Sequence, residues 1–321
     1  MTIRLFPNKT HFDFMGKRWL GFGFSIALTV LSLSLLFTKG LNLGIDFTGG
    51  ILMEIHSQKP LDLGAIRGSL NSQGFGEISL QNTGAPEDIM IRIQVSKDDD
   101  QAKVTARVKE VLAGQMGADN SIDYRKIDYV GPTVGQELIE NGIWAVLSSF
   151  AAIMLYVWFR FEWQYGVGAI LALVHDSIMI IGFFAVTRFE FGLTAVAAIL
   201  TIVGYSINDS VVIYDRIREN MRRFKKMPVF ELLNVSINDT LSRTILTAST
   251  VMLSSLSLAI FGGEVIRGFS CAMVFGTLIG TYSSIYISAP ALIYLHIRDQ
   301  GAGGGDQGKN LSVLTSLTPG P

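Results

Sequence analysis

The sequence has 321 residues, of which 49% are hydrophobic and 17% are charged, with a net charge of −1. Ordinary globular proteins carry about 25% charged residues, so this composition is typical of a membrane protein. The near-neutral charge excludes broad electrostatic binding of nucleic acid. Cys271 is the only cysteine and the four histidines are scattered, which excludes an intramolecular disulfide and a cysteine-based metal site. We therefore predict neither a metal nor a cofactor.

Stretches without charge predict six membrane-spanning helices, because about 20 apolar helical residues cross the hydrocarbon core of a bilayer. Four of the stretches contain no Asp, Glu, Lys or Arg, and the other two contain one carboxylate each, Asp176 and Asp209. In chain order the predicted spans are residues 19–38, 141–159, 163–187, 191–214, 244–263 and 268–295.

Lysine and arginine indicate the orientation of these spans. Basic residues gather in the flank formed by residues 1–18 and in residues 215–242, and such residues favour the cytoplasmic side. Six spans then bring residues 296–321 to the same side, so both termini are predicted to be cytoplasmic. This tail is rich in glycine and polar residues, and we expect it to be disordered. The first span lacks an Ala-x-Ala cleavage site and is predicted to be an uncleaved anchor.

Residues 39–140 form a long segment on the opposite side, and their hydrophobic pattern predicts an α+β domain. Alternating apolar residues indicate strands near residues 51–55, 78–80, 89–95 and 122–130, and helical spacing indicates helices near residues 63–70 and 104–112. The order β-α-β-β-α-β is that of the ferredoxin-like motif. The predicted fold is a membrane α-helical protein of six transmembrane helices, with this domain between the first and second.

A glycine-rich segment links the first span to the first predicted strand. Gly44, Gly49 and Gly50 permit positive φ, and Asp46 can hydrogen-bond the local backbone, so the segment is predicted to be a rigid structural turn. No Gly-Lys-Ser/Thr follows, and the next element is a strand, so a nucleotide-binding loop is excluded.

Charges inside spans are the sharpest functional signal, because each costs at least about 2.5 to 3.5 kcal/mol on insertion scales. Asp209 lies in the fourth span beside Ser206 and Asn208. Arg243 opens the fifth span from the same side, with Thr247 one turn further on. Their similar depths predict that Asp209 and Arg243 pair and couple to protons. An Arg243 that only anchors its helix at the interface is an equally good interpretation.

A second carboxylate, Asp176, lies near the middle of the third span and is a candidate relay residue. Ser206, Asn208 and Thr247 are candidate supporting residues. His175 directly precedes Asp176, but neighbouring residues of a helix point in different directions, so adjacency does not predict a pair.

These motifs resemble those of the SecF subunits of the bacterial Sec protein translocase, in the SecD/SecF family. The resemblance is carried by Gly44-Ile45-Asp46-Phe47-Thr48-Gly49-Gly50, by the stretch from Gly204 through Ser206-Ile207-Asn208-Asp209-Ser210 to Glu219, and by Ser242-Arg243-Thr244. It covers essentially the whole chain apart from the tail.

The resemblance implies a bacterial inner-membrane protein that uses the proton motive force to promote the export of preproteins, with residues 39–140 in the periplasm. It implies SecD as the partner, with a similar six-helix half, in an assembly like those of the RND transporter superfamily. The assembly would work beside the SecY, SecE and SecG channel, with YajC as a further associate and membrane lipid around the helices. Protons would be the coupling ion, and Asp209 would alternate between carboxylate and acid as its contact with Arg243 or a SecD residue changes.

Two other functional classes are weighed against this one. A passive membrane scaffold that presents a periplasmic binding domain would have no need of Asp209 and Arg243 inside the membrane. An intramembrane aspartyl protease needs Tyr-Asp and Gly-x-Gly-Asp motifs within facing spans, whereas here Tyr214-Asp215 ends a span and Gly303 to Asp306 lies in the tail. Since the outer segment has no nucleophile–base pair either, we predict that the protein is not an enzyme.

Overall fold

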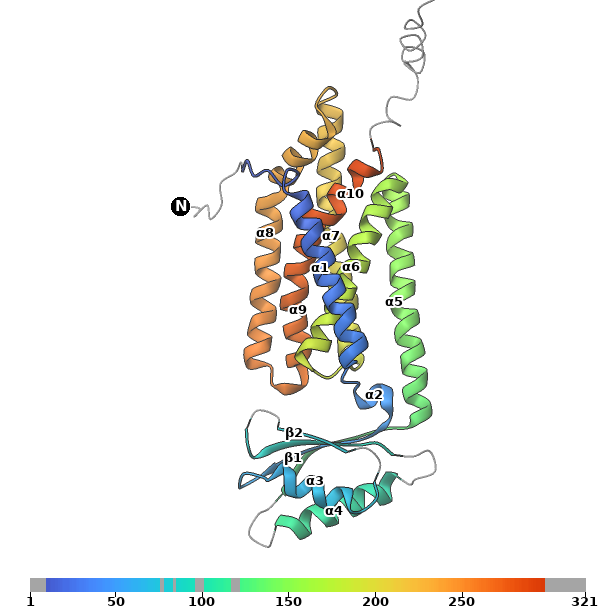
Figure 1. Ribbon diagram of the computed structural model, residues 1–321, viewed down its shortest axis with the longest axis vertical. Helices are drawn as coiled ribbons and strands as arrows, with labels where there is room; N and C mark the ends of the chain where they lie inside the picture. Colours follow the sequence, from blue (N-terminus) through green and yellow to red (C-terminus); the bar gives the residue numbers. More distant parts are fainter. Residues whose placement is uncertain (1–9, 76–77, 83–84, 96–100, 117–121, 298–321) are drawn as a thin grey trace, which may run out of the picture.

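The computed structural model describes residues 10–75, 78–82, 85–95, 101–116 and 122–297. Residues 1–9 of the predicted flank and residues 298–321 of the predicted disordered tail lie outside this range. Six long apolar helices lie side by side, and a small sheet with two helices lies at one end of them (Figure 1). The first five long helices are α1 (Arg18–Lys39), α5 (Pro132–Arg160), α6 (Trp163–Thr187), α7 (Leu193–Arg223) and α8 (Val229–Phe261).

The sixth long helix is composite. It consists of α9 (Glu264–Ser283), a π-helical turn η1 (Ser284–Ser288) and α10 (Ala289–Tyr294). Pro290 lies just after the π-helical turn, and a proline inside a helix removes one backbone hydrogen bond and disturbs the turn before it. The prediction of six helices of spanning length is confirmed.

Several helices extend beyond the charge-free stretches. Helix α5 begins at Pro132 rather than near residue 141, and α7 and α8 continue through most of residues 215–242 as a helical hairpin. This hairpin has its own apolar face, because Ile217, Leu232 and Ile237 are buried in one cluster. A charge-free stretch marks where a helix can cross a membrane, whereas an amphipathic helix continues as long as one face stays buried.

The N-terminal flank packs on the hairpin through two asparagines of α8. The amide of Asn238 accepts a hydrogen bond from the backbone N–H of Phe12 (2.9 Å) and donates one to the backbone carbonyl of Phe12 (2.8 Å). Asn234 accepts from the N–H of Phe14 (2.8 Å), and the side chain of Met15 is fully buried. The flank is therefore joined to a helix that lies 226 residues later in the chain.

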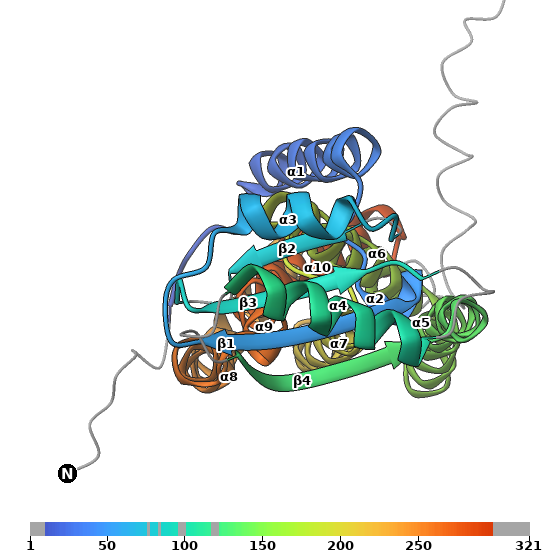
Figure 2. The same ribbon diagram turned by 90° about the horizontal axis from the view of Figure 1, so that it is seen from below.

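The sheet has four antiparallel strands in the order β2-β3-β1-β4 (Figure 2). Its elements in chain order are β1 (Gly50–Ser57), α3 (Leu63–Asn71), β2 (Ile78–Asn82), β3 (Asp88–Ile93), α4 (Gln101–Met116) and β4 (Ile122–Val130). Alternation places Ile51, Met53, Ile55, Ile89 and Ile91 on the face that packs with α3 and α4. Asp62 begins α3 by accepting hydrogen bonds from two backbone N–H groups of its first turn.

The other face of the sheet is turned toward the helix bundle (Figure 1). The register places Ser79, Arg92 and Leu52 in one row across β2, β3 and β1, and Gln81, Met90 and Glu54 in the next. In the bundle, α6 contacts α1, α5, α7 and α9 and forms the centre. The outer helices α1, α5 and α8 expose large apolar side chains, as helices surrounded by lipid do.

Candidate functional site

Two carboxylates lie buried in the centre of the helix bundle, as the sequence predicts for charges inside spans. Asp176 on α6 is 0% exposed and Asp209 on α7 is 4% exposed. Each has hydroxyl partners from a neighbouring helix, which is how a polar group is kept inside a membrane helix bundle. The two groups have different surroundings and are described separately.

Asp176 joins three helices. Its Oδ2 accepts hydrogen bonds from the hydroxyl of Ser206 on α7 (2.6 Å) and from the hydroxyl of Ser283 on α9 (2.8 Å). Its Oδ1 lies 3.1 Å from Nδ1 of His175. The adjacent histidine and aspartate are therefore in contact, which adjacency alone did not predict. Ser206 therefore contacts Asp176 and not Asp209.

Asp209 is less completely bonded. Its Oδ1 accepts a hydrogen bond from the hydroxyl of Thr244 on α8 (2.7 Å). Its Oδ2 is buried and has no hydrogen-bond partner among the residues that the structure describes. Buried polar atoms are usually hydrogen-bonded, so an unpartnered oxygen marks a place where a proton or an external donor fits.

The predicted pair of Asp209 and Arg243 is not formed in this structure. Among the ion pairs of the described residues none joins Asp209 to Arg243, and Arg243 is exposed. Thr244 faces α7 and donates to Asp209, and the residue before it lies about 100° round the helix, so Arg243 does not share that contact. Asn208 is exposed for the same reason, since Asp209 beside it faces inward. The Thr247 hydroxyl donates to backbone carbonyls of its own helix, those of Arg243 and Thr244 (3.0 Å each).

Sequence reasoning missed a row of buried hydroxyls between α7 and the π-helical turn. The hydroxyls of Ser210 and Ser284 lie 3.0 Å apart, and the Tyr214 hydroxyl is hydrogen-bonded to that of Ser288. The hydroxyl of Ser284 also donates to the backbone carbonyl of Ser206 (3.4 Å). The signal was present in the sequence, because residues 283, 284 and 288 are serines close together in a charge-free span that also contains a proline.

The glycine-rich turn connects the sheet to the bundle. Residues Ile45–Thr48 form the short helix α2, and Gly49 and Gly50 follow with φ of 71° and 125°. Gly50 is needed as glycine, because a Cβ there would lie 2.4 Å from the backbone oxygen of Ile93. Asp46 accepts a hydrogen bond at Oδ2 from the N–H of Leu193, the first residue of α7 (2.8 Å). The predicted local role of Asp46 is thus in fact a long-range contact.

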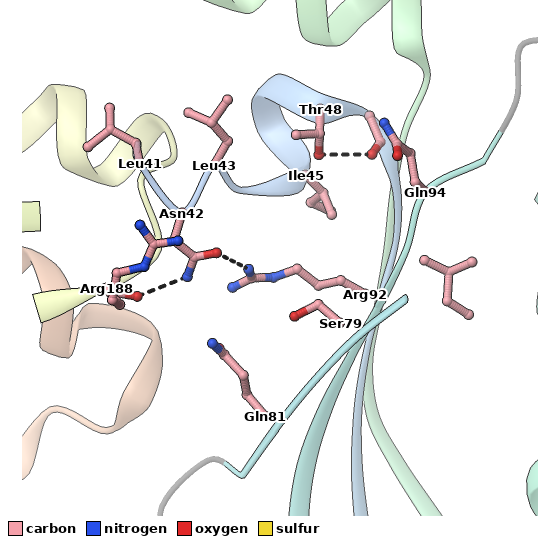
Figure 3. Close-up of a pocket in the computed structure, with 12 residues that line it drawn as sticks. Leu41, Asn42, Leu43, Ile45, Thr48, Ser79, Gln81, Arg92, Gln94 and Arg188 are labelled. Atoms are coloured by element: carbon pink, nitrogen blue, oxygen red, sulfur yellow. Dashed lines mark hydrogen bonds between the residues drawn. The ribbon is translucent and has the colours of Figure 1, made fainter. Parts of the chain in front are cut away.

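A cavity of about 520 Å³ lies between this turn and the sheet (Figure 3). Asn42 is at its centre, donating to the carbonyl of Arg188 (2.9 Å) and accepting from Arg92 (3.4 Å). The polar side chains that line the cavity are Asn42, Thr48, Ser79, Gln81, Arg92, Gln94 and Arg188. In the described part of the chain, no three His, Cys, Asp or Glu side chains are grouped so as to hold a metal ion.

Comparison with known proteins identifies the family. The model of the C-terminal part of protein export membrane proteins SecD/SecF matches residues 110–298, and the SecD/SecF GG motif matches residues 34–61. The protein translocase subunit SecF of Rickettsia akari is 50% identical over 290 residues, which cover 90% of this chain and 94% of that protein. The SecF of Rickettsia bellii is similar to the same extent, with 95% of its length covered.

Solved structures of SecDF show the same fold. The crystal structure of SecDF from Thermus thermophilus, described as a translocon-associated membrane protein, matches 91% of this chain with a TM-score of 0.80 and 35% identity. A second SecDF structure, in a super-membrane-facing form, matches 94% of it with a TM-score of 0.68 and 34% identity. The chain spans only 40% and 41% of those two proteins. The family model, the SecF relatives and these structures agree that this chain belongs to the SecD/SecF family of protein export membrane proteins.

Proposed function

We propose that this chain works with SecD to promote preprotein export across the bacterial inner membrane, and that the proton motive force drives it. Its role as a non-enzymatic protein-translocase subunit follows from its SecF relatives. The coupling to protons and the pairing with SecD go beyond that, and they rest on the buried carboxylates and on the part of SecDF that this chain does not cover.

The observation that carries the proposal is the unpartnered Oδ2 of Asp209. A carboxyl group deep in a span is costly and is seldom kept without a use. In its acid form, Asp209 supplies its own proton to the bare oxygen. In its ionised form it needs a donor there, and the exposed Arg243 or a SecD side chain would supply one. Protonation would then favour one packing of α7 and α8 over another, which is how a proton can drive a conformational change.

Asp176 has a different role in this proposal. It already holds two hydroxyl donors and lies on α6, between Ser206 of α7 and Ser283 of α9. We propose that it is a supporting group that holds the three helices together and passes on their displacement. Thr247, one turn from the exposed Arg243, and the exposed Asn208 are proposed to contact SecD.

The surroundings of the chain are proposals of the same kind. We infer that the termini and the α7–α8 hairpin are cytoplasmic and that residues 39–140 form a periplasmic ferredoxin-like domain, which the strand order β2-β3-β1-β4 supports. The exposed apolar faces of the outer helices would contact lipid and SecD. The SecY, SecE and SecG channel, YajC and the preprotein complete the proposed set of partners, in an assembly of the RND type.

The test is Asp209→Asn in inverted membrane vesicles, with preprotein translocation measured with and without a protonophore. Asn keeps the shape and can still accept from Thr244, but it cannot carry a proton. We expect normal accumulation and SecD association with loss of the gradient-dependent part of translocation. Asp215→Asn on the same helix is the control, because Asp215 is exposed and pairs only with Arg160 (3.0 Å) among the ion pairs described. Full gradient dependence in Asp209→Asn would instead favour the passive scaffold.

A further inference from the structure

An ion pair joins the polar face of the sheet to the bundle. Arg92, the last residue but one of β3, donates from Nη2 to Oε2 of Glu190, which lies in the loop between α6 and α7. The Arg92 side chain is 10% exposed and that of Glu190 is 33% exposed. Among the ion pairs of the described residues, this is the one that joins the sheet to the helix bundle.

Open space lies on both sides of this contact. The cavity of about 520 Å³ described above lies on the β2 side of Arg92, and another of about 160 Å³ lies on the β4 side of Glu190. The second is lined by Glu54, Lys126 and Asp128 of the sheet and by Phe189 and Thr194 of the bundle. Because the sheet is not packed against the bundle in these two places, the Arg92–Glu190 pair is a localised link.

The loop that carries Glu190 is held firmly by the chain around it. Its residue Phe191 forms a parallel bridge with Leu43, donating to the carbonyl of Asn42 (2.8 Å) and accepting from the N–H of Gly44 (3.0 Å). Arg188 donates to the carbonyls of Lys39 and Gly40 at the end of α1 (3.0 and 2.8 Å). Asp46 accepts from the first N–H of α7. A displacement of α6 or α7 therefore moves this loop as a unit with the turn that begins β1.

The two helices joined by this loop are those that carry the buried carboxylates. At 1.5 Å per residue, Asp176 lies about 18 Å along α6 from Arg188, and Asp209 lies about 24 Å along α7 from Leu193. Both helices are continuous over these distances. A change of helix packing at either carboxylate would thus displace Glu190.

We propose that Arg92 and Glu190 are positioning residues that transmit the movement of α6 and α7 to the outer sheet during translocation. This inference rests on the proposed function, because it assumes that a proton-driven movement reaches these helices. The alternative is a contact that only helps the protein to fold.

The experiment separates these roles by splitting translocation into its gradient-dependent and gradient-independent parts. In a Cys271→Ser background, the double variant Arg92→Cys and Glu190→Cys removes the ion pair, and a short bismaleimide then joins the two positions covalently. We expect loss of most of the gradient-dependent part before cross-linking, its recovery afterwards, and little change in the gradient-independent part. Arg125→Gln is the matched control, since Arg125 of β4 pairs with Asp88 of β3 within the sheet (3.1 Å).

Retention of the gradient-dependent part in the variant before cross-linking would overturn the proposal, and so would an equal loss of both parts that cross-linking leaves unchanged. If the cysteine variant does not accumulate, Glu190→Gln gives the same test, because it removes the charge and keeps the shape. Asp209→Asn is measured in parallel. If it keeps full gradient dependence, the proposed function fails. If Asp209→Asn loses gradient dependence while the Glu190 variants keep it, the proposed function stands and only the role of the Arg92–Glu190 pair is refuted.

Discussion

Removal of one hydroxyl donor from Asp176 should measurably destabilise the helix bundle. In Ser206→Ala and Ser283→Ala, the Oδ2 of Asp176 loses a hydrogen bond of 2.6 or 2.8 Å. All three side chains are 0% exposed, so water does not replace the lost donor. A hydrogen bond to a charged group contributes about 1.5 to 3 kcal/mol, whereas one between neutral groups contributes about 0.5 to 1.5 kcal/mol. If Asp176 is ionised, each substitution should therefore lower the free energy of unfolding by about 1.5 to 3 kcal/mol.

The assay is equilibrium unfolding in detergent micelles. Ser270→Ala is the control, because Ser270 is also a fully buried serine of α9, but its hydroxyl donates only to the carbonyl of Ile266 in its own helix (2.8 Å). Repeating Ser206→Ala and Ser283→Ala in an Asp176→Asn background isolates the interaction with the carboxylate, as in a double-mutant cycle. The reasoning is refuted if Ser206→Ala and Ser283→Ala are no more costly than Ser270→Ala, or if their cost is the same with Asn at position 176.

Three further predictions concern topology and the outer domain. A reporter that is active only outside the cytoplasm should be active when fused after Lys97 and inactive when fused after Lys226, and activity at Lys226 would contradict the six-span topology. Gly50→Ala should lower the free energy of unfolding by about 1 to 3 kcal/mol, because φ at Gly50 is 125° and the backbone oxygen of Ile93 occupies the place of the new Cβ. Gly68→Ala in α3, where the new Cβ meets nothing within 4 Å, should raise the stability by about 0.5 to 1 kcal/mol and is the control. Residues 50–130 expressed alone should unfold cooperatively in urea, since they contain a buried cluster of their own, and a gradual transition would show that the sheet depends on the bundle.

The sequence predicts the helices of the bundle better than their ends. Charges are costly along a span, so a stretch with at most one Asp, Glu, Lys or Arg locates each crossing almost by itself. The continuation of α7 to Arg223 and of α8 back to Val229 depends instead on tertiary burial of residues such as Leu233, which a search for charge-free stretches does not detect. In the outer segment, the alternation of Ile89, Ile91 and Ile93 gives β3, whereas the order of the strands needs contacts between distant residues.

The sequence likewise predicts some features of the candidate site and not others. The cost of burying a charge identifies Asp176 and Asp209 from the sequence. Which hydroxyl meets which carboxylate depends on about 100° of rotation per residue, so Thr244 rather than Arg243 faces Asp209. The contacts of Asp46 with α7 and of Arg92 with Glu190 join segments 147 and 98 residues apart, and no sequence motif predicts either contact.

The contact between the N-terminal flank and α8 limits the order in which the protein can fold during synthesis. Phe12 cannot find Asn238 until 226 more residues have been synthesised. At about 5 to 20 residues per second, that takes on the order of ten to fifty seconds. During this interval only the apolar length of α1 can hold it in the bilayer, because α8, on which the flank before α1 packs, has not yet been synthesised. All strands of the outer sheet are thus synthesised before the contact between the N-terminal flank and α8 can form.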